Sequence, residues 1–410
     1  MGRGVFRNLD RRLTTILMIV FVQMVGASLI LPILPLYAQD EFGLSPQAIT
    51  LLAASFFAAQ FLAGPYLGRL SDRVGRVPVL LVSQIGTVVA FISLGLAPAA
   101  WVLYAARILD GITGGNIIVA QAYVTDVTPP EKRSEALGMI LAAFGISFFV
   151  GPALGGLALR LFGPRIPYLL AAVAALITLL ITWRVLDESV EPAGDTKVVA
   201  DRPKLTTRLV LSNRSILLVL LLGFLGRSVL GLLIGTFALF GEAVLFVDWD
   251  PESVGLGVGL ILTTVGLSQF FTQTTLLRPA LKRFGELRLI EVGVILRAAG
   301  MGLVALTSSP WLAAAGSAMY ASGSGLTVPP TQSIATKAVD DSLRGGILGL
   351  YQSLSSLGVI VSTAIGGVLF AIDPFLPFQI GAVVALAALL PALALRKTYA
   401  AVISTTPELD

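Results

Sequence analysis

Arg107 and Asp110 are two opposite charges inside one long apolar stretch, the segment 100–124. Residues three apart on an α-helix share a face, so these side chains can meet. At about 1.5 Å per residue from Trp101, Asp110 lies roughly 14 Å along such a helix. Near the midplane of a membrane an ionisable group is costly unless it is paired or hydrated, and it marks a functional site by default. The pair predicts a proton switch in which protonation of Asp110 releases Arg107; the alternative is a permanent ion pair that only orders the bundle.

The stretch GRLSDRVGR at 68–76 is a second cluster of charged residues that could form ion pairs. It contains three arginines and an aspartate in a chain with 13% charged residues. Its two glycines permit a tight turn and close helix approach. Asp72 is short enough to meet the positive end of a neighbouring helix, and one of the arginines can pair with Asp126. We expect a latch between helix ends; the alternative is that the arginines only set membrane orientation. The expected latch residues are Gly68, Asp72, Arg73, Gly75, Arg76 and Asp126.

The composition requires that these residues sit in an integral membrane protein. The 410-residue chain is 56% hydrophobic with a mean hydropathy of +0.89, far above the soluble range. Segments of about 20 apolar residues are long enough to cross the bilayer, and they predict an all-α protein with twelve transmembrane helices. These are expected at 13–37, 47–69, 77–97, 100–124, 135–160, 165–186, 214–240, 253–277, 287–307, 310–334, 344–371 and 374–395.

The distribution of basic residues predicts the orientation of these helices. Most of the 28 lysines and arginines fall in alternate loops and at both ends of the chain, whereas the other loops hold only Arg160 and Arg165. Short cytoplasmic loops accumulate positive charge. We therefore expect a multi-pass protein of the cell membrane with both termini in the cytoplasm. The isoelectric point of 9.4 then reflects topology, and no nucleic-acid partner is expected.

An internal repeat divides the chain into two similar halves. A shift of 211 residues places Gln121–Leu157 over Gln332–Val368 with nine identities, more than chance composition gives. The sequence thus predicts two pseudo-symmetric six-helix bundles, at 1–186 and 214–410, joined by a cytoplasmic linker at 187–213. Lys282 and Lys337 stand where the first half has Asp72 and Asp126, so only the first half is expected to carry the full latch.

Several function classes are disfavoured by what the sequence lacks. It contains no cysteine and no histidine, which excludes disulfides, thiol chemistry, haem and most zinc sites. We find no phosphate-binding loop, metal-ligand cluster or nucleophile with a base. We therefore expect no enzymatic activity, no metal and no cofactor, with the proton as the coupling ion.

Three motifs occur in the order and at the helices where the major facilitator superfamily carries its signatures. GRLSDRVGRVPVL resembles the superfamily's loop between helices two and three, RILDGITGG at 107–115 its fourth-helix motif, and GPALGG at 151–156 the fifth-helix motif of its proton-driven exporters. The chain most resembles the twelve-span drug:proton antiporters, which include tetracycline exporters. One departure is Asp110, where that family usually has glutamine. The antiporter motif residues are Gly151, Pro152, Gly155 and Gly156.

The resemblance implies a rocking transporter with its binding site near the midplane between the halves. It also implies that Asp72 meets the helix that starts near Arg344.

Arg227 lies about thirteen residues into its helix and has no acidic neighbour one turn away, so it needs a partner or an anionic ligand. Glu242 is either a second titrating group or a solvated helix end. By analogy, polar residues that face the cavity are Gln23, Asn116, Arg227, Gln332, Tyr351 and Gln352.

Together these features predict a proton-coupled antiporter that exports small, largely apolar or drug-like molecules by alternating access. One alternative is a carrier of an anionic metabolite or lipid head group anchored by Arg227. A non-transporting membrane sensor fits less well, because the latch is intact and the sequence shows no appended soluble domain. The expected partners are the small-molecule substrate and the lipid bilayer, and the expected state is a monomer.

Overall fold

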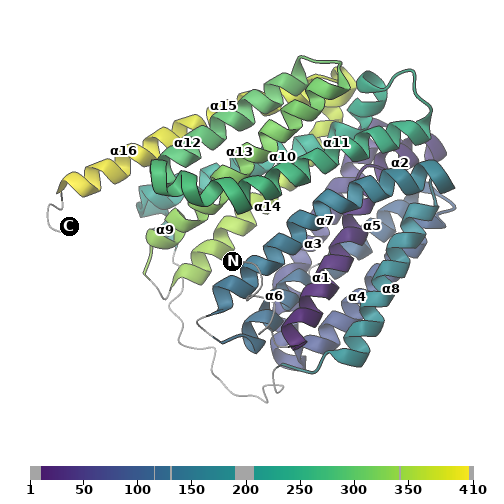
Figure 1. The fold of residues 1–410 in the computed structure, drawn as a ribbon, viewed down its shortest axis with the longest axis horizontal. Coiled ribbons are helices and arrows are strands. Elements are labelled where there is room, and N and C mark those ends of the chain that lie inside the picture. Colours follow the sequence, from purple (N-terminus) through teal and green to yellow (C-terminus); the bar gives the residue numbers. More distant parts are fainter. Residues whose placement is uncertain (1–10, 115, 130–131, 190–206, 341–342, 406–410) are drawn as a thin grey trace. The chain divides into compact units, whose positions relative to one another are not determined.

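The computed structural model describes the chain except residues 1–10, 115, 130–131, 190–206, 341–342 and 406–410. The described residues form helices joined by short turns, without a β-strand (Figure 1). Each of the twelve expected segments is largely helical among the described residues. Ten helical stretches are long and apolar enough to cross a membrane. One of them, Pro251–Ala305, covers two expected spans, and the segment 310–334 is a long helix too rich in Gly, Ser, Thr and Pro to count among the ten.

The helices group into two compact units. Unit 1 consists of Met1–Ser45, Ser55–Thr196 and Asp248–Gly266, and unit 2 of Pro46–Ala54, Lys197–Val247 and Leu267–Asp410. The larger part of the expected linker, 190–206, lies outside the described residues.

The helices of unit 1 are, in chain order, α1 (Arg11–Leu29), α2 (Leu34–Phe42), most of α3 (Pro46–Val74), α4 (Arg76–Gly95), α5 (Ala100–Gly114), α6 (Asn116–Val127), α7 (Arg133–Phe162), α8 (Ile166–Val185) and the larger part of α11 (Pro251–Phe271). Those of unit 2 are the start of α3, α9 (Thr207–Ser212), α10 (Arg214–Phe240), the π-helical turns η3 (Gly241–Leu245) and η4 (Thr272–Leu276), α12 (Leu277–Ala305), α13 (Pro310–Lys337), α14 (Arg344–Ile372), α15 (Leu376–Ala387) and α16 (Leu389–Thr405).

Two expected spans are broken where the sequence contains proline. The span at 13–37 is divided into α1 and α2 around Pro32, and the span at 374–395 is interrupted at Ala388, just before Pro391. A proline has no backbone N–H and its ring clashes with the preceding turn, so it interrupts the helical hydrogen bonds. Membrane helices tolerate such breaks where neighbouring groups satisfy the freed carbonyls.

Close helix packing through small residues holds each unit together. In unit 1, α1 lies along α7 and α8, and α4 lies along α8 and α5 (Figure 1). In unit 2, α12 packs along α13 and α10 along α14. Where α12 meets α13, a Cβ at Gly300 would overlap the carbonyl oxygen of Gly316, and the reverse is also true. Lipid tails are as apolar as leucine, so such van der Waals contact between backbones is a main source of helix association.

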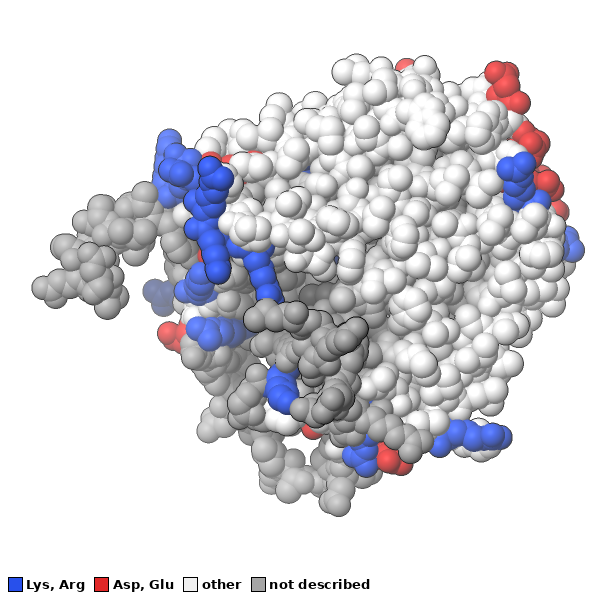
Figure 2. Space-filling view, in the orientation of Figure 1, with Lys and Arg blue, Asp and Glu red and all other residues white. Residues whose placement is uncertain are grey.

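On the face drawn in Figure 2 most of the surface is uncharged, and the blue and red side chains lie towards its margins. Large apolar side chains such as Leu62, Trp101 and Trp311 are exposed on the described helices. Contiguous exposed apolar surface of this kind marks a membrane-facing region.

Candidate functional site

The buried ion pair of unit 1 lies on α5. Arg107 Nη1 donates to Asp110 Oδ2 at 2.7 Å, and both side chains are buried. The guanidinium carbon of Arg107 also lies 4.0 Å from the ring centroid of Phe56 on α3, a cation–π geometry. Arg107 Nε has no hydrogen-bond partner among the described residues. The carboxylate and the ring therefore contact the guanidinium, and its Nε–H group remains without an acceptor among the described residues.

A tyrosine beside this pair, Tyr168, was not predicted from the sequence. Tyr168 on α8 is fully buried and interacts electrostatically with Arg107. Its ring centroid lies 5.2 Å from that of Tyr37 on α2. The hydroxyl of Tyr168 has no hydrogen-bond partner within the described part of the chain, whereas that of Tyr37 interacts with Arg165 and Glu41. Buried hydroxyls are normally satisfied, so the hydroxyl of Tyr168 is an unused polar group beside Arg107. No spacing in the sequence brings residues 37, 107 and 168 together.

The expected latch residues meet around Arg76 at the start of α4. Its guanidinium contacts Asp72 Oδ1 at 2.6 Å, Asp126 Oδ2 at 3.0 Å and the hydroxyl of Ser71 at 2.7 Å. Arg76 is therefore the arginine that pairs with Asp126, whereas Arg73 is exposed at the end of α3. Gly68 packs next to the Ile118 side chain of α6. One guanidinium thus joins the ends of α3, α4 and α6.

Glu188 completes this network, although the sequence predictions placed it in the linker. Its carboxylate accepts hydrogen bonds from the backbone N–H groups of Arg76 at 2.9 Å and Val77 at 3.0 Å. The turn that presents these groups depends on Gly75, whose φ of 102° favours glycine. Ser189 Oγ adds a contact to Asp126 at 3.3 Å. A carboxylate at the first turn of a helix satisfies unpaired N–H groups and the helix dipole.

Replacement of Glu188 by alanine is expected to loosen the start of α4. The change removes both hydrogen bonds, so we expect a loss of about 1 kcal/mol in the free energy of unfolding. Glu188→Gln keeps one acceptor oxygen and should fall between alanine and the wild type. The measurement is thermal unfolding in detergent, together with hydrogen exchange at Val77. Equal stability of all three proteins would contradict the capping role.

Unit 2 carries a similar turn in which the charges are reversed in sign. Gly285 has a φ of 75°, like Gly75. Glu286 follows it where unit 1 has Arg76, and Lys337 Nζ lies 2.9 Å from both carboxylate oxygens of Glu286. Lys337 replaces Asp126, and Glu286 compensates for this change by replacing Arg76. A second ion pair therefore ties the turn to α13.

The antiporter motif on α7 is a surface for close backbone contact. A Cβ at Gly151 would overlap Ser28 Oγ of α1, and one at Gly155 would overlap the carbonyl oxygen of Leu29. Pro152 and Gly156 lie against α11, also within unit 1. Ser147, where the family pattern has glycine, is buried and donates to the carbonyl oxygen of Phe21 at 3.1 Å. The hydroxyl thus adds a bond between α7 and α1.

The expected substrate residues fall in both units. Gln23 is buried on α1, Gln332 is half-buried on α13 and Gln352 is exposed on α14. The side chain of Asn116 lies outside the described residues. Tyr351 is buried in the core of unit 2, and its ring occupies the space above Gly223.

Two ionisable candidates belong to unit 2. Arg227 is half-buried on α10 and interacts electrostatically with Tyr351. It has neither an ion pair nor a hydrogen bond to another described residue. Glu242 is half-buried in the π-helical turn η3 and has an interaction partner of its own. The structure therefore brings Arg107 and Asp110 together in unit 1, and Arg227 near Tyr351 in unit 2. No group of three His, Cys, Asp or Glu side chains suited to a metal ion occurs among the residues described.

Comparison with known proteins identifies the family. A model of the Major Facilitator Superfamily matches residues 16–271 and 231–408, which together span nearly the whole chain. The class C tetracycline resistance protein of Escherichia coli is 32% identical over 365 residues, covering 87% of this chain and 90% of that protein. The chain belongs to the Major Facilitator Superfamily. This superfamily member is therefore a multi-pass membrane transporter and not an enzyme.

Other members of the superfamily support the assignment. Multidrug resistance protein 2 of Bacillus subtilis is 26% identical, with 88% of each chain covered. Among solved structures, the peptide transporter POT has a TM-score of 0.80 at 13% identity, covering 95% of this chain and 94% of its own. The human organic anion transporter MFSD10 has a TM-score of 0.68 at 19% identity, covering 93% of this chain and 99% of its own. These structures share the fold with the present chain.

Proposed function

We propose that this superfamily member exports drug-like, largely apolar small molecules from the cell in exchange for protons. The observation that carries the proposal is the buried Arg107–Asp110 pair in a chain similar to tetracycline and multidrug resistance proteins. An ionisable residue inside a membrane helix bundle is costly and persists where it serves a proton or ion pathway. The proton is the coupling ion, and no further cofactor is required.

In the proposed cycle, protonation of Asp110 weakens its hold on Arg107 Nη1. The guanidinium is then free to turn on the Phe56 ring toward other acceptors. Proton entry uses the buried hydroxyl of Tyr168, which is a hydrogen-bond donor and acceptor without a hydrogen-bond partner in the described chain. Rearrangement of the pair is coupled to the latch at Arg76, because a transporter that alternates access must break and remake contacts at helix ends.

The orientation belongs to the same proposal. The protein lies in the cell membrane with both termini in the cytoplasm, since basic residues accumulate in cytoplasmic loops. It works as a monomer, and its partners are the substrate and the surrounding lipid. The latch around Arg76 then lies on the cytoplasmic side, where it closes the outward-facing state.

The decisive experiment measures proton movement in proteoliposomes of known orientation. A pH gradient is imposed, and a panel that includes tetracycline and neutral, cationic and anionic compounds is added one at a time. The proposal requires proton movement that depends on the added drug, together with uptake of that drug into vesicles whose cytoplasmic face is outside. Drug movement without proton movement would rule out antiport.

Arg227 supports a second candidate, the carriage of an anionic metabolite or lipid head group. Its guanidinium lacks an acidic partner in the described structure, and a cation at membrane depth requires a counter-charge. On this candidate, Arg227→Gln lowers the affinity for anionic compounds by about tenfold or more, since a charged hydrogen bond contributes about 1.5–3 kcal/mol. Arg214→Gln, at the exposed start of the same helix, is the matched control. Unchanged transport of every anion by Arg227→Gln would remove this candidate.

A further inference from the structure

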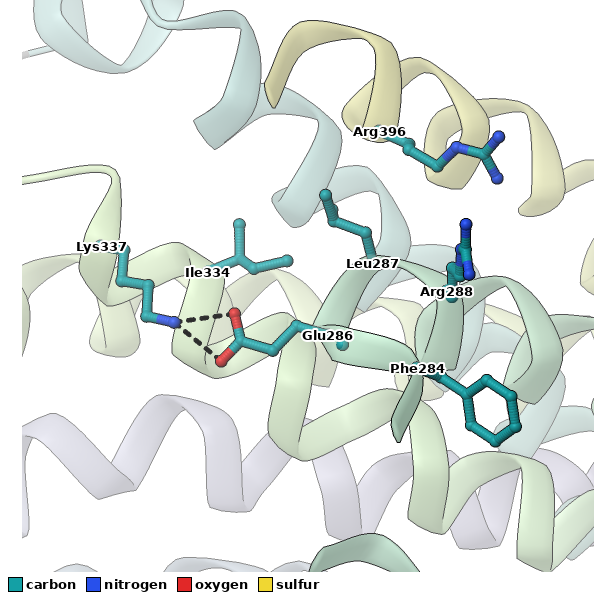
Figure 3. Close-up of a pocket in the computed structure, with 8 residues that line it drawn as sticks. Phe284, Glu286, Leu287, Arg288, Ile334, Lys337 and Arg396 are labelled. Carbon is teal, nitrogen blue, oxygen red and sulfur yellow. Dashed lines mark hydrogen bonds and ion pairs between the residues drawn. The ribbon is translucent and has the colours of Figure 1, made fainter. Parts of the chain in front are cut away.

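A cavity of about 450 Å³ opens at one end of unit 2, beside the turn that contains Gly285. Its apolar wall includes Leu287 and Ile334, and its rim includes the exposed ring of Phe284. Three basic side chains also line it: Arg288 from α12, Lys337 from α13 and Arg396 from α16. Figure 3 shows these three elements around the cavity.

One of the three cations that line the cavity, Arg288, has no acidic partner among the described residues. Lys337 Nζ forms an ion pair with Glu286 Oε2 at 2.9 Å, and Arg396 Nη1 forms one with Glu291 Oε2 at 2.9 Å. Arg288 has no ion pair or hydrogen bond with any described residue, and its guanidinium points toward the side where Arg396 lies (Figure 3). Two guanidiniums that face one space repel each other unless an anion lies between them. An anion that bridges them would gain charge-assisted, bidentate hydrogen bonds.

The corresponding turn of unit 1, at Gly75, shows which group occupies the equivalent position there. The carboxylate of Glu188 lies against Gly75, so close that a Cβ on this glycine would touch it. At Gly285, by contrast, an added Cβ would meet nothing within 4 Å. Gly75 and Gly285 are 210 residues apart, and at the same offset Thr398 corresponds to Glu188. The Thr398 hydroxyl donates to the carbonyl oxygen of Ala394 in its own helix. Unit 2 thus lacks the internal carboxylate and has extra arginines instead.

We propose that this cavity binds the phosphate group of an anionic membrane lipid. The phosphate lies between Arg288 and Arg396, which present the planar donor geometry that suits phosphate oxygens. The cavity is at the start of the span at 287–307, where basic residues meet apolar helix surface, and Phe284 offers a contact for the glycerol and upper acyl region. Basic pockets between membrane helices on the cytoplasmic side are suited to such head groups. The bound lipid joins α12 to α16 as Glu188 joins α8 to α4.

The test is lipid binding by the purified full-length protein in neutral detergent. Native mass spectrometry measures retention of phosphatidylglycerol against phosphatidylcholine with the same acyl chains, and inorganic phosphate is added as a soluble competitor. We expect selective retention of phosphatidylglycerol. Arg288→Gln and Arg396→Gln should each weaken its binding by about fivefold, the contribution expected for one basic residue at a membrane surface. Lys282→Gln, an exposed cation of α12 outside the cavity, is the control and should bind as the wild type does.

Arg288→Gln is the decisive variant, because Arg288 has no described protein partner whose loss could disturb the fold. Binding of phosphatidylglycerol that is unchanged by Arg288→Gln, or equally weakened by Lys282→Gln, would overturn the proposal. Displacement of the lipid by millimolar inorganic phosphate would show a site for a soluble anion and would overturn the lipid assignment. Because the readout is binding, the result does not depend on drug transport or on proton coupling.

Discussion

Asp110→Asn is expected to reduce drug-dependent proton movement to the level of empty liposomes. The carboxyl of Asp110 is the only acidic group in contact with Arg107 among the described residues, and an amide cannot exchange a proton in its place. The change also leaves the Arg107 guanidinium buried without a counter-charge, which costs about 3–5 kcal/mol for a buried pair. The measurement is the pH change in proteoliposomes of known orientation, with protein abundance in the membrane determined in parallel.

A double variant separates the loss of coupling from the loss of stability. Arg107→Gln combined with Asp110→Asn removes both charges, so no uncompensated ion remains, and the melting temperature should recover toward that of the wild type. Proton coupling should stay absent. If either variant still moves protons when drug is added, the coupling group lies elsewhere, and Glu242 in η3 becomes the first residue to test.

Gly155→Ala is expected to destabilise the protein by about 2–3 kcal/mol, the upper range for overpacking. The added methyl group would overlap the carbonyl oxygen of Leu29, which is backbone and cannot rotate away. Helix α7 would have to move from α1 along the surface that also contains Gly151. Thermal unfolding in detergent, with transport by the surviving protein, measures the effect.

Gly138→Ala is the matched control on the same helix. A Cβ at Gly138 meets nothing within 4 Å, and alanine favours a helix over glycine by up to about 1 kcal/mol. The control should therefore be neutral or slightly stabilising. An equal loss of stability at both positions would mean that α7 tolerates no side chain for reasons other than its contact with α1.

The twelve spans and the Arg107–Asp110 pair could be predicted because they depend on local properties of the sequence. Apolar length predicts a membrane helix, and a spacing of three places Arg107 and Asp110 on one face before any tertiary contact is known. The sequence also predicted that one arginine of GRLSDRVGR pairs with Asp126, since the order and direction of the spans place these residues at the same ends of their helices. Each of these inferences needed only the helix period and the direction of each span.

Tertiary structure alone decided which residues complete these sites. Glu188 follows a span in a largely polar segment, and nothing in its neighbours indicates that it folds back to Arg76 and Val77. Tyr168 looks like any aromatic residue of a membrane helix, and its place beside Arg107 depends on how α8 packs. The sequence by itself determined the helices and the buried charge pair, because helical periodicity and the hydrophobic effect act along the chain, and its three motifs indicated the family by resemblance. The partners of those charges depend on contacts between helices distant in sequence, so only packing determines them.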